Sequence, residues 1–127
     1  MLSSVDSGKY FSQPIRVLVD LTLVLLFITI GLTSHQEPLS QLLATAAPFL
    51  LAACAGHLGV WAVSSRRQLP LLLEGFMMWV STLVLGLGLR LSFGDTAATT
   101  FVLVSALTLL VFLVGWRLIL VLVRRKA

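Results

Sequence analysis

Four long apolar runs, separated by short polar segments, make up most of the chain. They cover residues 15–33, 39–63, 69–91 and 96–123. A helix needs roughly 20 mainly apolar residues to cross the hydrocarbon core of a bilayer, and each run is about that long or longer. The pattern therefore predicts four transmembrane helices. Because the connections are only a few residues long, we expect an all-α, up-down bundle of antiparallel neighbours.

The segments outside these runs are short and polar. Residues 1–14 form an arm that ends at Pro14, a residue suited to the first turn of a helix. Residues 124–127 form a basic tail. The first run is too long for the core of a secretory signal, and no small-residue cleavage site follows it. We therefore expect the first helix to be retained, so that 15–123 form one transmembrane domain.

The composition supports a membrane protein. Of 127 residues, 58% are hydrophobic and 11% are charged, whereas about a quarter of the residues in soluble domains are charged. A soluble domain this short could not shield so much apolar surface from water. The net charge of +4 comes from basic residues clustered at the ends of the runs. This position is typical of anchors at lipid headgroups, so we expect a lipid bilayer as partner and no nucleic acid.

The distribution of Lys and Arg predicts the orientation of the bundle. If both ends of the chain lie on one side, that side carries seven basic residues: Lys9, Arg16, Arg66, Arg67, Arg124, Arg125 and Lys126. The opposite side carries Arg90 alone. Because cytoplasmic loops are enriched in Lys and Arg, we expect both termini to be cytoplasmic.

Each predicted helix carries one ionisable residue at nearly the same depth. Arg117 lies six residues before Val123, about 9 Å inside the cytoplasmic end at 1.5 Å per residue. Asp20, His57 and Glu74 lie five or six residues inside the same end of their helices. Charges inside spans are rare and costly unless they are paired. These four residues therefore predict an intramembrane polar cluster.

We expect Arg117 to pair with Asp20, Glu74 or both, because a guanidinium can serve two carboxylates. His57 would accept or donate a hydrogen bond at the rim of the cluster. Arg16 is a competing partner for Asp20, although it is near enough to the interface to extend outward. Two interpretations are open: the cluster fixes the helix register, or it has a function such as proton binding.

Small residues gather in the second run, at Ala52, Ala55, Gly56 and Gly59. They form overlapping small-xxx-small pairs, and this spacing lets helix backbones approach closely in lipid. We expect these residues to pack helices together within the bundle. Self-association of two chains through the same face is the alternative.

A second polar group, which includes His35 and Arg90, is expected at the outer side. Its members would be solvated loop and interface residues. The three tryptophans are expected to be partial interfacial anchors: Trp61, Trp79 and Trp116.

Signatures of catalysis are absent from the sequence. It contains no Gly-rich phosphate loop, no nucleophile elbow and no set of His and Cys residues that would give His57 a metal site. The single cysteine, Cys54, excludes an internal disulfide. We therefore expect no catalytic residues, metal or cofactor, and a protein that is not an enzyme.

Several short segments together resemble a known family. They are Asp20, the GLTSH segment that ends in His35, Pro48-Phe49, Gly88-Leu89-Arg90 and Gly115-Trp116-Arg117. The chain resembles the domain of unknown function 3054 family, which consists of small bacterial and archaeal membrane proteins. The resemblance implies a four-helix integral membrane protein without an assigned activity. We expect the protein to lie in the bacterial inner membrane. It implies that Asp20, His35, Arg90 and Arg117 are the positions to test.

Three functions are compatible with these features. A small proton-coupled carrier would use the intramembrane polar cluster, and a chain of this length would need to dimerise to enclose a path. An accessory or scaffolding subunit of a larger membrane complex would use the small residues of the second helix. An anionic-lipid-binding protein would hold a headgroup with Arg66, Arg67 and Arg117.

Overall fold

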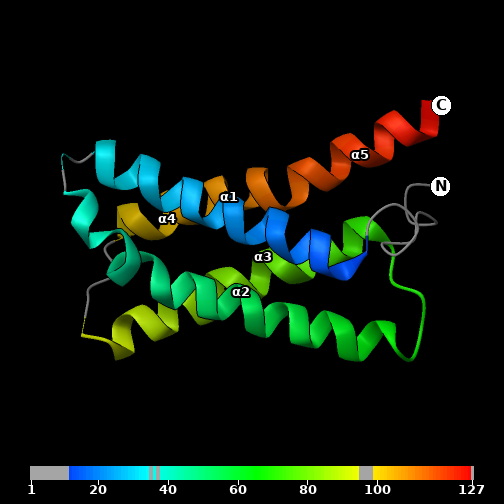
Figure 1. The fold of residues 1–127 in the computed structure, drawn as a ribbon, viewed down its shortest axis with the longest axis horizontal. Coiled ribbons are helices and arrows are strands. Elements are labelled where there is room, and N and C mark those ends of the chain that lie inside the picture. The colour runs from blue at the N-terminus through cyan, green and yellow to red at the C-terminus, as the bar shows by residue number, and fades with distance from the viewer. Residues whose placement is uncertain (1–11, 35, 37, 95–98, 127) are drawn as a thin grey trace.

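The computed structural model describes residues 12–34, 36, 38–94 and 99–126 (Figure 1). Within these ranges the regular elements are helices. In chain order they are α1 (Gln13–Ser34), the short 3₁₀ turn η3 (Leu39–Gln41), α2 (Leu42–Ser64), α3 (Leu71–Ser92), α4 (Thr99–Leu109), the π-helical segment η4 (Leu110–Val114) and α5 (Gly115–Lys126).

Four helical stretches are long and apolar enough to cross a membrane: Gln13–Thr33, Leu39–Ser64, Leu71–Ser92 and Thr99–Arg124. The shortest has 21 residues. At 1.5 Å per residue it is about 32 Å long, which matches a hydrocarbon core of about 30 Å. The predicted all-helical fold with four such stretches is confirmed.

Several helix ends differ from the predicted bounds. α1 already includes Gln13, which the sequence pattern placed in the polar arm, and α5 continues to Lys126, into the predicted tail. α3 begins at Leu71, because Pro70 has an extended conformation and precedes the first helical residue. The predicted start at residue 96 lies outside the described residues.

The helices form an up-down bundle in which consecutive spans run in opposite directions (Figure 1). α2 packs along α3 and also contacts α1, and the α4–η4–α5 span packs against α3. α1 and α3 begin, and α2 and α5 end, at the same end of the bundle (Figure 1). We call this the basic end, because Arg66, Arg67 and Arg124 lie there.

Phe49 is the centre of the aromatic core. It is fully buried on α2, and its ring centroid lies 6.1 Å from those of both Phe27 on α1 and Phe101 on α4. The Phe27 contact is edge-to-face, a preferred geometry for aromatic pairs. The same ring covers Gly86 on α3 so closely that a Cβ there would collide with it. Glycine at position 86 therefore allows Phe49 to join α1, α2, α3 and α4.

We expect Gly86→Ala to destabilise the bundle by about 1–3 kcal/mol, because the added methyl group overpacks a filled core. Gly88→Ala is the matched control on the same helix, since a Cβ at Gly88 would meet nothing within 4 Å. Alanine favours a helix over glycine by about 1 kcal/mol, so the control should be neutral or stabilising. Thermal unfolding in detergent micelles measures both changes. Equal melting temperatures for the two variants would contradict this packing.

The small residues of α2 divide between two faces. Ala52 and Gly56 are buried, and a Cβ at Gly56 would lie 3.1 Å from both Met78 Sδ and Ser81 Cβ of α3. Ala55 and Gly59 are exposed instead, so their predicted packing role within the bundle was wrong. The reason is helical geometry: three residues turn the helix by about 300°, which rotates the second pair off the buried face.

Candidate functional site

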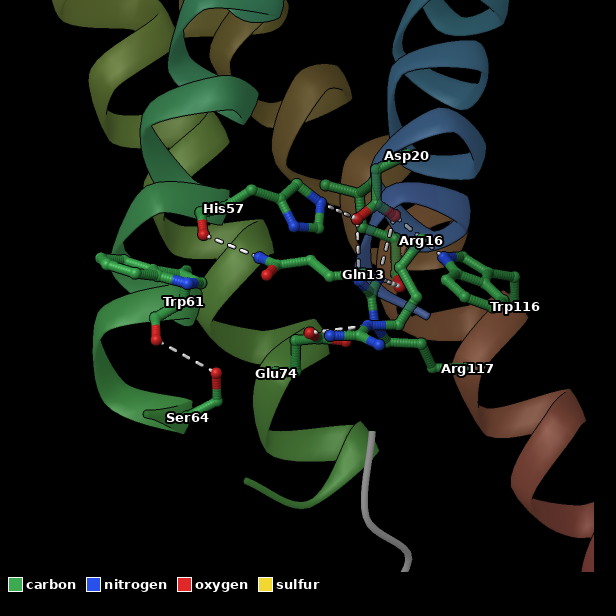
Figure 2. A network of polar contacts seen from close by, with 10 residues as sticks. Gln13, Arg16, Asp20, His57, Trp61, Ser64, Glu74, Trp116 and Arg117 are labelled. Atoms are coloured by element: carbon green, nitrogen blue, oxygen red, sulfur yellow. Dashed lines mark hydrogen bonds and ion pairs between the residues drawn. The ribbon is translucent and has the colours of Figure 1, made fainter. Parts of the chain in front are cut away.

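Arg117 is the centre of a buried polar cluster near the basic end (Figure 2). Its side chain has no exposed surface. Nη1 and Nη2 donate to the two carboxylate oxygens of Asp20 at 2.9 and 2.7 Å, and Nε donates to Glu74 Oε2 at 3.1 Å. Nη1 also donates to the backbone oxygen of Leu113 at 2.8 Å. One guanidinium thus joins carboxylates from α1 and α3, with the bidentate geometry that makes such pairs strong.

Asp20 accepts hydrogen bonds from three side chains on two helices, α2 and α5. Besides the fork of Arg117, its Oδ2 lies 2.7 Å from His57 Nε2 of α2, and its Oδ1 accepts a bond from Trp116 Nε1 at 3.0 Å. Asp20 is fully buried, and His57 is 4% exposed. The carboxylate is therefore fully enclosed by donors, as a buried charge requires.

Glu74 completes the cluster with a second arginine. Its Oε1 accepts a bond from Arg16 Nε at 2.9 Å, while Oε2 faces Arg117. Both Glu74 and Arg16 are buried. With Asp20, the cluster contains two carboxylates and two guanidiniums, so its formal charge is zero when His57 is neutral. Mutual neutralisation of this kind offsets part of the cost of burying charges.

The local backbone explains how Arg117 reaches this position. The π-helical segment Leu110–Val114 immediately precedes α5 and supplies the oxygen of Leu113 to the guanidinium. Gly75 of α3 faces the same segment: a Cβ there would lie 2.9 Å from Arg117 Cδ and 3.4 Å from Val114 Cα. The missing side chain at Gly75 therefore lets the fourth span approach α3 beside Glu74. Single π-helical turns inside α-helices are rare and frequently occur at functional sites.

His57 has a defined tautomer and one unused ring nitrogen. An ionised carboxylate can only accept hydrogen bonds, so the 2.7 Å contact with Asp20 requires the hydrogen on Nε2. In the neutral ring Nδ1 then carries a lone pair. Nδ1 is buried and has no hydrogen-bond partner among the described residues. Gln13 Nε2 donates to the backbone oxygen of His57 at 3.0 Å, which ties the start of α1 to this part of α2 (Figure 2).

The structure brings together the four residues that the sequence placed at one depth: Asp20, His57, Glu74 and Arg117. His57 lies inside the cluster, not at its rim. Arg16 was expected to compete for Asp20 or extend outward, but it turns inward and pairs with Glu74.

Two further members of the cluster were not expected. Trp116 was assigned to the interface, yet it donates to Asp20. Gln13 was placed in the arm, but it belongs to α1 and contacts α2. Their proximity in sequence to Arg117 and Arg16 is the one available signal, and it does not indicate which way a side chain points.

The other predicted residues lie away from this cluster. The Arg90 guanidinium lies 4.4 Å from the ring centroid of Phe101, a cation–π contact near the opposite end of the bundle. His35 lies outside the described residues. Trp79 donates to the backbone oxygen of Ala106 at 2.8 Å and so connects α3 to α4. Trp61 is 61% exposed, as an interfacial side chain would be.

Within the described ranges, no three His, Cys, Asp or Glu side chains are grouped so that they could hold a metal ion. Cys54 is exposed on α2. The carboxylates, imidazole and guanidiniums of the cluster can form ion pairs, and its carboxylates and imidazole can bind and release protons.

The fold and the cluster define a class: a four-helix protein whose helices can cross a membrane and whose interior holds a charge-balanced set of ionisable side chains. The family model described as "Protein of unknown function (DUF3054)" matches residues 17–120. The chain belongs to this family, as the segments around Asp20 and Arg117 predicted. No curated protein and no solved structure matches the chain.

Proposed function

We propose that the protein is a small, non-enzymatic, proton-coupled membrane carrier whose proton-binding site is His57 within the buried cluster. The observation that carries this proposal is the unpartnered lone pair on His57 Nδ1, which lies next to a set of ion pairs that is already neutral. Nδ1 can accept a proton without any ion pair first being broken. Ionisable residues inside spans commonly mark the path of ions or protons.

Proton uptake at this position would change the balance of forces between helices. It would raise the formal charge of the cluster from zero to +1. The added charge would contact Asp20 of α1 directly. Through the bonds of the cluster it would be linked to Arg117 of α5, Glu74 of α3 and Arg16 of α1. Asp20 Oδ2 is shared by His57 and Arg117, so a protonated imidazole would compete with the guanidinium for the same oxygen. Protonation would thereby favour a different arrangement of the helices, which is the coupling that a carrier requires.

We also propose that the protein spans the bacterial inner membrane with the basic end in the cytoplasm. Support comes from the arginines of the loop after α2 and at the end of α5, which are all at that end of the bundle. This distribution follows the excess of Lys and Arg that cytoplasmic segments show.

The test is a flux measurement in proteoliposomes with an imposed pH gradient, an internal pH-sensitive dye and a panel of small solutes. We expect at least one solute to dissipate the gradient. His57→Gln keeps a side-chain N–H for Asp20 but removes the titratable nitrogen, so it should reduce this flux at least tenfold while the protein remains folded.

The matched control is His35→Gln, which replaces the other histidine of the chain. It should leave the flux unchanged. Equal flux in the wild type and His57→Gln, or a wild type that couples no solute of the panel to protons, would contradict the proposal.

A second candidate function, that of a subunit in a dimer or larger membrane complex, is favoured by the second face of α2. Ala55 and Gly59 are exposed there, and a Cβ at Gly59 would meet nothing within 4 Å. Such a surface suits close packing of another membrane helix. Purification in a mild detergent and mass spectrometry of the intact complex would reveal a stoichiometric partner. Loss of that partner in Gly59→Leu would support this role.

A further inference from the structure

A surface hollow of about 540 Å³ lies beside the last turn of α2 at the basic end. Ala62, Val63, Arg66 and Arg67 line it. The lining thus combines two apolar residues with two positively charged ones. This combination suits an amphiphile more than a free ion or a purely apolar molecule.

The two arginines of the hollow differ from the buried ones. Arg16 and Arg117 each form an ion pair with a carboxylate. Arg66 and Arg67 are exposed, and neither forms an ion pair with a carboxylate of the described residues. The charge of the cluster is balanced, whereas the charge of the hollow is not. The hollow therefore attracts an anion.

The loop that presents the arginines is held by its own backbone. The amide groups of Arg66 and Arg67 both donate to the oxygen of Val63, at 3.0 and 3.1 Å. The hydroxyl groups of Ser64 and Ser65 donate to backbone oxygens of α2. The guanidiniums are therefore the donors that the hollow offers to a ligand.

The hollow lies at the depth of lipid headgroups if α2 crosses the membrane. The apolar stretch ends at Ser64, and the arginines follow two and three residues later. Trp61, five residues before Arg66, is largely exposed, as is typical of side chains at the membrane surface. Arg117, which the sequence had grouped with the two loop arginines, is enclosed in the cluster and does not line the hollow.

From these observations we infer that the hollow binds the headgroup of an anionic phospholipid. Arg66 and Arg67 bind the phosphate oxygens, and Ala62 and Val63 contact the glycerol and upper acyl carbons. Paired guanidiniums suit this role because their planar donors match the geometry of phosphate. The inference is independent of the proposed proton site.

The test is native mass spectrometry of the purified protein in detergent, titrated with phosphatidylglycerol or with phosphatidylcholine of the same acyl chains. We expect the wild type to bind phosphatidylglycerol at least tenfold more tightly. Arg66→Gln/Arg67→Gln should weaken that binding roughly 30-fold, since each basic residue near an anionic lipid surface contributes about 1 kcal/mol.

The control variant Arg124→Gln removes a positive charge at the same end of the bundle, from a residue that does not line the hollow. It should change phosphatidylglycerol binding by less than about threefold, because Arg124 does not line the site. If this control loses as much affinity as the hollow variant, the lipid is held by the general positive charge of the basic end, and the proposed site in the hollow is wrong. If inorganic phosphate displaces the lipid at equal concentration, the site binds free anions and the lipid assignment is wrong. Equal binding of both lipids would also overturn the inference.

Discussion

Replacing Arg117 by leucine is expected to lower the free energy of unfolding by about 3–5 kcal/mol, one of the two largest effects expected of a single substitution in the cluster. Two buried carboxylates, Asp20 and Glu74, lose a shared partner, and both are fully enclosed. Glu74 keeps Arg16, whereas Asp20 keeps the neutral donors His57 and Trp116. Most of the cost therefore falls on Asp20. Denaturation of the purified protein in mixed micelles measures the change.

Two matched variants separate this cause from a general effect of losing an arginine. Arg66→Leu makes the same chemical change at an exposed position and should cost less than about 0.5 kcal/mol. Arg117→Lys keeps the charge but not the planar fork, so its stability should lie between those of the wild type and the leucine variant. A leucine variant that unfolds like the wild type would show that the buried pairing is absent.

Asp20→Asn is expected to destabilise the protein by a comparable amount and to abolish proton-coupled flux. The amide retains the shape of the side chain, but it leaves the cluster with a formal charge of +1. Its NH₂ group replaces one of the two carboxylate oxygens, so it faces a donor of Arg117 and, depending on the oxygen replaced, that of His57 or Trp116. Flux should be lost because His57 no longer has the carboxylate that holds its tautomer. Proteoliposome flux, with unfolding measured in parallel, tests both effects.

Charge balance makes a further prediction for the double variant Asp20→Asn/Arg117→Leu. Its remaining pair, Arg16 with Glu74, is again neutral. We therefore expect the double variant to be more stable than the sum of the two single changes implies, with a coupling energy of about 1–3 kcal/mol. Strictly additive destabilisation would show that Asp20 and Arg117 contribute independently.

Much of the fold could be predicted because the apolar runs are long and the polar segments between them are short. Length and hydropathy are local properties, and they determine how many helices can cross a membrane. The π-helical segment at Leu110–Val114 was not predicted. Its residues LVFLV are as apolar as those of an ordinary span. A π-helical turn holds more residues than an α-helical turn, but in a uniformly apolar segment this does not change the hydrophobic pattern. It is associated instead with a tertiary contact, the approach of the fourth span to Gly75.

The main residues of the cluster could also be predicted, because ionisable groups in spans are conspicuous and depth follows from position in the helix. Depth does not give rotation about the helix axis. Arg16 lies in the first turn of α1, where its charge can be satisfied by water outside or by a carboxylate inside the bundle. It turns inward because Glu74 is there to pair with it. The direction of Trp116 depends in the same way on the position of Asp20, to which it donates. The sequence therefore indicated a level in the bundle but not the complete set of contacts.

The most direct test of the proton site is the protonation of His57, observed by nuclear magnetic resonance of ¹⁵N-labelled histidine. In a His35→Gln background His57 is the sole histidine of the chain. At neutral pH we expect hydrogen on Nε2 and a bare Nδ1, and on acidification a reversible uptake of a proton at Nδ1 while the fold is retained. A hydrogen on Nδ1 at neutral pH, or a ring that stays neutral until the protein unfolds, would contradict the proposed proton-binding role of the cluster.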